Sequence, residues 1–157
     1  MATAFVALGS NLGDRRHHLK QALKELGDLP QTDLSLVSSW RETLPVGGPP
    51  QGVYLNGVAR IETELSPEAL LLCFQEIERR LGRPMNHEKW GARAIDLDLI
   101  SYNQVVLKTE ILTIPHPLLQ KRRFVLEPLL EIAPDWVHPQ SGKNAQALLE
   151  ELSCADH

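Results

Sequence analysis

Residues 53–82 read VYLNGVARIETELSPEALLLCFQEIERRLG and predict a strand followed by a helix. Val53–Leu65 alternates between apolar and polar side chains, which is the period-two pattern of a half-buried strand. Ser66 is a favourable N-cap, and Pro67 suits the first position of a helix. Up to Gly82 the apolar side chains then recur at helical spacing and predict one buried helix face, made of Leu70, Leu71, Phe74, Ile77 and Leu81.

The segments on either side of this unit complete a familiar order of elements. Before it we expect a strand at Thr3–Leu8, an amphipathic helix that ends at Gly27, and a strand at Leu34–Trp40. After it we expect a strand at Ala94–Tyr102. The order β-α-β-β-α-β is that of a ferredoxin-like core, an antiparallel sheet with helices on one face. Many functions share this arrangement, so the fold does not decide the function.

A smaller C-terminal extension follows this core. Thr109–Pro117 is expected to be extended, and short helices are expected near Phe124–Ile132 and Lys143–Leu152. Two stretches, Arg41–Gly52 and Arg83–Arg93, are expected to be long loops, and loops of such length are often functional. The predicted fold class is therefore α+β, with residues 1–157 forming a single domain.

The composition excludes several classes of protein. The chain has 157 residues and a net charge of −4, with 43% hydrophobic and 23% charged residues, which is typical of one globular domain. The mild acidity argues against a general nucleic-acid-binding surface, and we find neither a secretory signal nor a membrane-spanning stretch. Cys73 and Cys154 form no disulfide framework and no zinc motif, so we expect a cytoplasmic protein.

A pair of aspartates in the last strand of the expected core is the clearest candidate site. Side chains alternate across a strand, so Asp96 and Asp98 share one face while Ile95, Leu97 and Leu99 share the other. Aspartate is depleted in strands, and a bound cation would relieve the repulsion between the two charges. Mg²⁺ suits one or two carboxylates, with water and substrate phosphates as its other ligands. The alternative is an exposed strand face with two solvated carboxylates.

The segment before this strand is basic. Glu88 is its single acid among five cations, which are Arg79, Arg80, Arg83, Lys89 and Arg93. Carboxylates suited to a metal ion therefore lie beside cations suited to phosphate, and phosphoryl transfer requires this combination. The alternative, a solvated basic loop, leaves unexplained the abrupt change from basic to acidic residues within Lys89–Asp98.

Aromatic and amide side chains indicate a flat ligand near the phosphate. Trp90 has little core to enter and is placed to stack on a ligand, while Tyr54 and Asn56 share a face of their strand. Phe124 follows three cations, and His116, between two prolines, is a candidate phosphate contact. Ordinary packing is the alternative for each of these residues. We expect no ligand role for the other rings, with packing against the sheet for Trp40 and Trp136 and solvation for His17 and His18.

Residues 89–100 read KWGARAIDLDLI and resemble the signature of the 6-hydroxymethyl-7,8-dihydropterin pyrophosphokinase family of folate biosynthesis. Further matching blocks are GSNLG at 9–13, YLN at 54–56, and IPHP at 114–117 followed by Arg122 and Phe124, so the resemblance covers nearly the whole chain. The family implies that ATP donates its terminal diphosphate, as one unit, to the pterin hydroxymethyl group. The products are AMP and the pterin diphosphate, in a step of tetrahydrofolate biosynthesis.

The resemblance also implies a role for each matching residue. Asp96 and Asp98 would hold two Mg²⁺ ions that bridge the triphosphate of ATP. Arg83, Trp90 and Arg93 would act in catalysis from a loop that closes over both substrates. The implied ATP contacts are Glu78, Arg83, Lys89, Trp90, Arg93, His116 and Arg122. The implied pterin contacts are Tyr54 and Phe124 on the two ring faces, and Asn56 with the backbone of Thr43, Leu44, Pro45 and Val46 at the ring edge.

Two other classes of function stay open from the residues alone. An RNA-recognition domain shares the element order but needs a basic, aromatic third strand, and residues 53–59 hold one aromatic and no basic residue. A sensor could bind ATP and Mg²⁺ without turnover, which the aspartate pair disfavours. The chain has no GxxxxGK[ST] motif, which excludes a Walker-type ATPase. We expect a monomeric enzyme without nucleic-acid or membrane partners, whose general base is either Asp98 or a metal-bound hydroxide.

Overall fold

The computed structural model describes residues 1–11, 13–43, 53–82 and 94–155. Its main sheet has five strands in the order β2-β4-β1-β5, with β3 paired to β4 beside this path. All pairings in the sheet are antiparallel. The strands are β1 (Ala2–Ser10), β2 (Thr32–Val37), β3 (Arg41–Thr43), β4 (Tyr54–Thr63) and β5 (Asp96–Tyr102).

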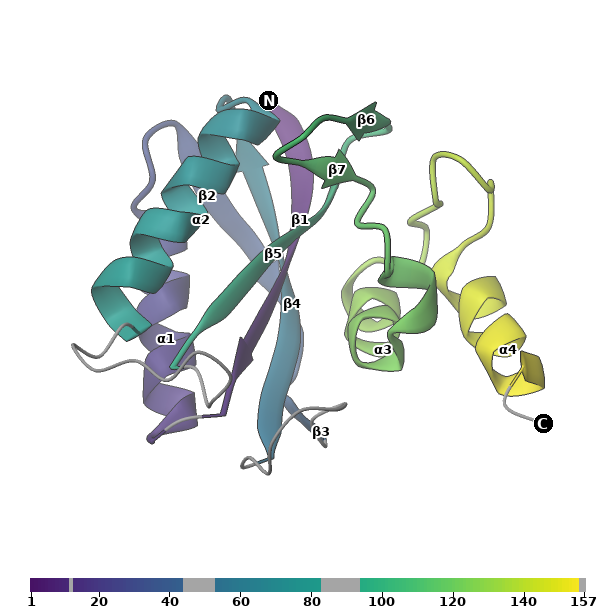
Figure 1. The fold of residues 1–157 in the computed structure, drawn as a ribbon, viewed down its shortest axis with the longest axis horizontal. Helices are drawn as coiled ribbons and strands as arrows, with labels where there is room; N and C mark the ends of the chain where they lie inside the picture. Colours follow the sequence, from purple (N-terminus) through teal and green to yellow (C-terminus); the bar gives the residue numbers. More distant parts are fainter. Residues whose placement is uncertain (12, 44–52, 83–93, 156–157) are drawn as a thin grey trace.

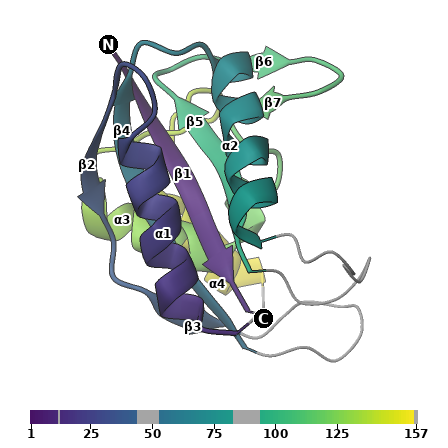
Figure 2. The same ribbon diagram turned by 90° about the vertical axis from the view of Figure 1, so that its left-hand side faces the viewer.

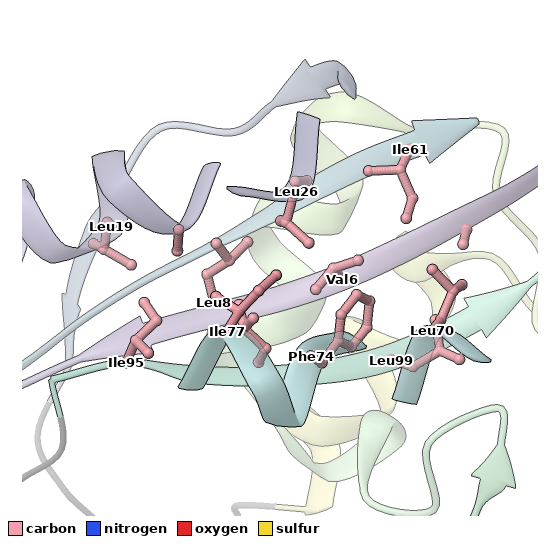
Figure 3. Close-up of a cluster of buried hydrophobic side chains, with 14 of the residues drawn as sticks. Val6, Leu8, Leu19, Leu26, Ile61, Leu70, Phe74, Ile77, Ile95 and Leu99 are labelled. Atoms are coloured by element: carbon pink, nitrogen blue, oxygen red, sulfur yellow. The ribbon is translucent and has the colours of Figure 1, made fainter. Parts of the chain in front are cut away.

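Two helices, α1 (Arg15–Gly27) and α2 (Pro67–Gly82), lie side by side on one face of the sheet (Figure 2). The Asp14 carboxylate caps α1 by accepting a hydrogen bond from the His17 backbone N–H at 3.1 Å, and Ser66 Oγ accepts from the Ala69 N–H at 3.2 Å before α2. Figure 3 shows the core between these helices and the sheet, formed by buried side chains such as Val6, Leu8, Leu19, Leu26, Phe74 and Ile77.

Two further helices, α3 (Arg123–Ile132) and α4 (Ala145–Ala155), lie on the opposite face of the sheet (Figure 1). The core helices α1 and α2 thus lie on one face of the sheet, as expected, while the C-terminal helices, to which the sequence analysis assigned no face, lie on the other side. The physical reason is that the central strands are apolar on both faces, and a sheet of that kind must be covered twice. A second buried cluster joins the sheet residues Phe5, Val58 and Ile100 to the helix residues Val125, Leu126, Leu129 and Leu148.

Tertiary contacts explain the other differences from the sequence predictions. The expected loop Arg41–Gly52 begins with β3, which becomes a strand because it pairs with β4, and the rest of it lies outside the described residues. The expected extended segment Thr109–Pro117 contributes only β7 (Thr113–Ile114) to a two-stranded ladder with β6 (Leu107–Lys108). A short 3-10 helix, η1 (Leu119–Lys121), leads into α3.

The rings expected to have no ligand role are mostly packed. Trp136 is buried in the second cluster, and its Nε1 donates to Ser101 Oγ at 3.1 Å. Trp40 packs against the first cluster, and its ring covers Gly57, where an added Cβ would lie 2.5 Å from the indole. His17 is exposed as expected, but His18 is half-buried, and its Nδ1 has no hydrogen-bond partner in the described part of the chain. None of the helices described in residues 1–11, 13–43, 53–82 and 94–155 is long and apolar enough to cross a membrane.

Candidate functional site

A pocket of about 540 Å³ opens on the sheet face that α3 covers. It lies where the C-terminal end of β1 meets the N-terminal ends of β4 and β5, and η1 and the start of α3 close its other side. This volume is in the range of small-molecule sites. The residues that line it are Ala7, Leu8, Gly9, Thr43, Tyr54, Asn56, Gly57, Asp96, Asp98, Leu118, Lys121, Arg122, Phe124 and Val125.

The register of the sheet builds the floor of the pocket. Gly9 on β1 pairs with Asn56 on β4 and with Asp96 on β5, so these three residues form one row across the sheet. A Cβ added to Gly9 would lie 2.7 Å from Asn56 Oδ1 and 3.6 Å from Tyr54 Cδ1. The Asn56 side chain can therefore lie across this position only because residue 9 is glycine.

The two aspartates occupy the face that the alternation predicts. Asp96 and Asp98 both line the pocket, whereas Ile95, Leu97 and Leu99 belong to the buried cluster on the other face. The Asp98 side chain is 48% exposed, and its Oδ2 lies 3.8 Å from Nη1 of Arg122. This places a carboxylate and a guanidinium side by side at the pocket.

The donor set suits Mg²⁺ without a complete cage of protein ligands. Two carboxylates of one strand face supply hard oxygen ligands, and no group of three or more His, Cys, Asp or Glu side chains that could hold a metal occurs within the described residues. Mg²⁺ commonly accepts such a site because water and substrate phosphates complete its octahedron. Asp96 and Asp98 therefore fit a magnesium ion that arrives with a phosphate ligand.

Arg122 and His116 are two candidate phosphate contacts among the described residues. The Arg122 guanidinium lies 5.6 Å from the centroid of the Phe124 ring, a cation–π contact, in addition to its pairing with Asp98. Burial lowers the pKa of His116; the charge of Asp98 opposes this shift and that of Arg122 adds to it. The Nδ1 of His116 accepts a hydrogen bond from the Leu118 N–H at 3.1 Å, so the proton of the neutral ring is on Nε2.

The expected contacts of a flat ligand also meet at this pocket. Tyr54 and Asn56 come from β4, Thr43 comes from β3, and Phe124 comes from α3 on the opposite side. Asn56 is 7% exposed, and its Nδ2 donates a short hydrogen bond to Thr43 Oγ1. The amide is thus held in one orientation, which suits the recognition of a ring edge by hydrogen bonds.

Two described candidates, His116 and Glu78, do not line the pocket. Glu78 lies on α2. Its Oε2 accepts a hydrogen bond from the Leu97 N–H at 2.9 Å, which ties α2 to the start of β5. Its implied contact with ATP stays a prediction. The candidates Arg83, Lys89, Trp90, Arg93, Leu44, Pro45 and Val46 lie outside the described residues.

Gly9 and Lys121 line the pocket but had no assigned role in the sequence analysis. Gly9 belongs to the GSNLG block, but only its pairing with Asn56 and Asp96 reveals why a side chain would not fit there. Lys121 belongs to the run of three cations that precedes Phe124, and that run was the signal that could have identified it.

A comparison with known families identifies the family of the chain. The family model described as 7,8-dihydro-6-hydroxymethylpterin-pyrophosphokinase (HPPK) matches residues 5–134. The chain belongs to this family. Among its relatives are two proteins named 2-amino-4-hydroxy-6-hydroxymethyldihydropteridine pyrophosphokinase. The Synechocystis protein is 45% identical over 96% of this chain and 76% of its own length. The Haemophilus influenzae protein is 45% identical over 100% of this chain and 96% of its own length.

Solved structures with the same fold are longer HPPK-DHPS chains. One, an HPPK-DHPS in complex with substrates, has a TM-score of 0.73 at 12% identity and is matched by 99% of this chain. Another, Plasmodium falciparum HPPK-DHPS with pteroate, has a TM-score of 0.73 at 14% identity. This chain spans 46% and 44% of those two chains, so it corresponds to less than half of each.

Membership in the HPPK family establishes the general activity. The chain is a pyrophosphokinase of folate biosynthesis, and the family's substrates are ATP and the hydroxymethyldihydropterin. The resemblance of residues 89–100 to the HPPK signature is thereby confirmed.

Proposed function

We propose that this chain transfers the terminal diphosphate of ATP, as one unit, to 6-hydroxymethyl-7,8-dihydropterin in the described pocket. The hydroxymethyl oxygen forms a bond to the β-phosphorus, the bond between that phosphorus and the α,β-bridging oxygen breaks, and AMP leaves with the bridging oxygen. The hydroxymethyl proton is released. The observation that carries this proposal is the pocket that joins Asp96 and Asp98 to Arg122 and an aromatic wall, in a chain of this family.

The carboxylate end of the pocket is proposed to hold the phosphates. Asp96 and Asp98 would bind two Mg²⁺ ions, which when present would neutralise the charge that develops on the β-phosphate. Arg122 would turn from Asp98 toward a phosphate oxygen, since its guanidinium already lies at the pocket. The neutral His116 would donate from Nε2 to a phosphate oxygen, because its Nδ1 is occupied by the Leu118 N–H.

The aromatic end of the pocket is proposed to hold the pterin. Tyr54 and Phe124 would stack on its two faces, because they enter the pocket from β4 and from α3. Asn56, held by Thr43, would read the ring edge together with the backbone of Thr43, Leu44, Pro45 and Val46. Stacking and edge recognition in one half-enclosed pocket favour a flat, polar heterocycle.

The remaining implied residues complete the proposal. Arg83, Lys89, Trp90 and Arg93 would contact ATP, with Arg93 as a phosphate clamp, and Glu78 would lie near the nucleotide. We propose that residues 1–157 act as one domain, because α4 packs on α3 and α3 supplies part of the pocket wall. We also propose a cytoplasmic monomer, since the two cysteines suit a reducing compartment and the carboxylates, the cations and the aromatic wall meet in a single pocket. Size-exclusion chromatography with light scattering tests the monomer.

Phosphorus NMR of the purified protein with ATP, Mg²⁺ and the pterin tests the reaction. We expect AMP and a pterin diphosphate ester. ADP would contradict the proposal and indicate transfer of a single phosphoryl group. Unchanged ATP, with ATP binding intact, would indicate a sensor.

Two ATP analogues make this test sharper. The β,γ-methylene analogue should still react, because the bond that breaks lies on the other side of the β-phosphorus. The α,β-methylene analogue should bind without reacting, because its bridging carbon cannot leave. The reverse result would refute diphosphate transfer.

A further inference from the structure

The carboxylate of Glu131 on α3 connects that helix to the segment that contains β3. Its Oε2 accepts a hydrogen bond from the Ser39 backbone N–H at 2.8 Å, and its Oε1 accepts from Ser39 Oγ at 2.8 Å and from Arg41 Nη2 at 3.2 Å. The backbone hydrogen bond from Ser39 is the largest cause of a lowered pKa of Glu131, so this carboxylate is charged at neutral pH. Three donors therefore converge on one carboxylate.

The strand β3 has little else to hold it. It contains three residues, and among the described strands it pairs only with β4. Thr43, at its end, lines the pocket and receives the hydrogen bond from Asn56 Nδ2. A shift of β3 would therefore move Thr43 and release the Asn56 amide from its orientation.

The same face of α3 contributes to the opposite wall of the pocket. Phe124, Glu127 and Glu131 are spaced at i, i+3 and i+7, which places them on one stripe of the helix. Phe124 lines the pocket, while Glu127 and Glu131 reach Arg41 on β3. This stripe of α3 thus contributes Phe124 to one wall of the pocket, and it also holds β3, which contributes Thr43 to the other wall.

We propose that Glu131 is a positioning residue for the pterin. By holding Ser39 and Arg41, it sets the position of Thr43 and Asn56 relative to Phe124, and therefore the width of the pocket. This inference rests on the proposed function, because it assumes that the pterin binds between these residues.

The test is Glu131→Gln, which keeps the size of the side chain but replaces one acceptor oxygen with a donor that faces other donors. We expect the KM for the pterin to rise by about tenfold, since misplacement of a binding group by a fraction of an ångström has effects of this order. The KM for ATP and kcat should change by less than about twofold. Glu127→Gln is the matched control, because it removes only the 3.7 Å ion pair to Arg41, and the pterin KM should then change by less than about twofold.

Phe124→Ala separates failure of this inference from failure of the proposed function. If Phe124→Ala raises the KM for the pterin and Glu131→Gln does not, the positioning role is refuted and the pocket assignment stands. If neither variant changes it, the pterin does not bind in this pocket, and both proposals fail. If Glu131→Gln lowers kcat and raises the KM for the pterin and the KM for ATP by similar factors, the variant is generally destabilised, and the positioning role is also refuted.

A second variant covers the case in which Glu131→Gln does not fold. Ser39→Ala removes only the hydroxyl donor and leaves the backbone hydrogen bond to Glu131. We expect a rise of about threefold in the KM for the pterin, with an unchanged KM for ATP. Where Glu131→Gln does fold, its effect and that of Ser39→Ala should be less than additive in the double variant, because both changes act on the same contact. A fully additive result, or no effect of Ser39→Ala, would overturn the inference.

Discussion

Replacing Gly9 with alanine should narrow the pocket at its floor. The new Cβ would lie 2.7 Å from Asn56 Oδ1, whereas an ordinary carbon–oxygen contact is about 3.3 Å, so the amide must retreat by about 0.6 Å. It cannot simply rotate away, because it is 7% exposed and its Nδ2 donates to Thr43 Oγ1. Overpacking of this kind typically costs about 1–3 kcal/mol.

The assay is steady-state kinetics of Gly9→Ala combined with thermal unfolding. We expect the KM for the pterin to rise by about tenfold or more, because misplacement by 1 Å can cost about 10²-fold. The KM for ATP should change little, since the three atoms nearest the new Cβ belong to Asn56 and Tyr54. The melting temperature should fall by roughly 2–10 °C, in proportion to the overpacking cost.

Gly27→Ala is the matched control for Gly9→Ala. Its Cβ would meet Leu34 Cβ at 3.8 Å, an ordinary contact, and it lies at the end of α1 without a positive φ. We expect unchanged kinetics and an equal or slightly higher melting temperature, because alanine is the better helix former. Unchanged pterin KM in Gly9→Ala, with the protein folded, would refute the role of Asn56 as a rigid floor.

Further predictions concern the metal site, the pH dependence and the second core. Asp98→Ala should abolish turnover without unfolding the protein, because the side chain is 48% exposed; wild-type activity would rule out the metal role. Burial lowers the pKa of His138 below its ordinary value of 6.5, because it disfavours the charged ring. The folded state is therefore favoured at pH values above 6.5, where the ring is neutral. This stability is lost as the pH falls through 6.5 toward the folded pKa, and His138→Gln should flatten the dependence of unfolding free energy on pH between about 7 and 5. Leu126→Ala, at a fully buried position, should lower the free energy of unfolding in urea by about 2–5 kcal/mol. Leu72→Ala, at a position that is 64% exposed, should lower it by less than about 0.5 kcal/mol. Equal losses in the two variants would contradict the core assignment.

The helices of the core followed from local patterns. α2 spans Pro67–Gly82, between the residues whose capping and helix-ending properties predicted its bounds. The strand β3 could not be predicted from local patterns, because three residues without alternation carry no local signal. Its pairing with β4 creates the strand, and pairing depends on the tertiary fold.

The position of α3 and α4 relative to the sheet was also not predicted. α3 and α4 were expected as helices, but not as the cover of a second sheet face. Phe5 and Val6 are consecutive apolar residues of β1 and belong to the two different buried clusters. Consecutive apolar residues were the sequence signal that both faces of this strand are buried. A strand buried on both faces requires two layers of helices. The half-burial of His18 likewise depends on packing and has no sequence signal.

The sequence by itself determined that Asp96 and Asp98 share one strand face, and it carried the motif of the HPPK family. This was possible because alternation along a strand is a property of neighbouring residues. Only the tertiary structure brought Arg122 to Asp98, Gly9 to Asn56, and Glu131 to Ser39. These pairs are distant in the chain, and their contacts depend on sheet register and on helix packing, which are set by the fold as a whole.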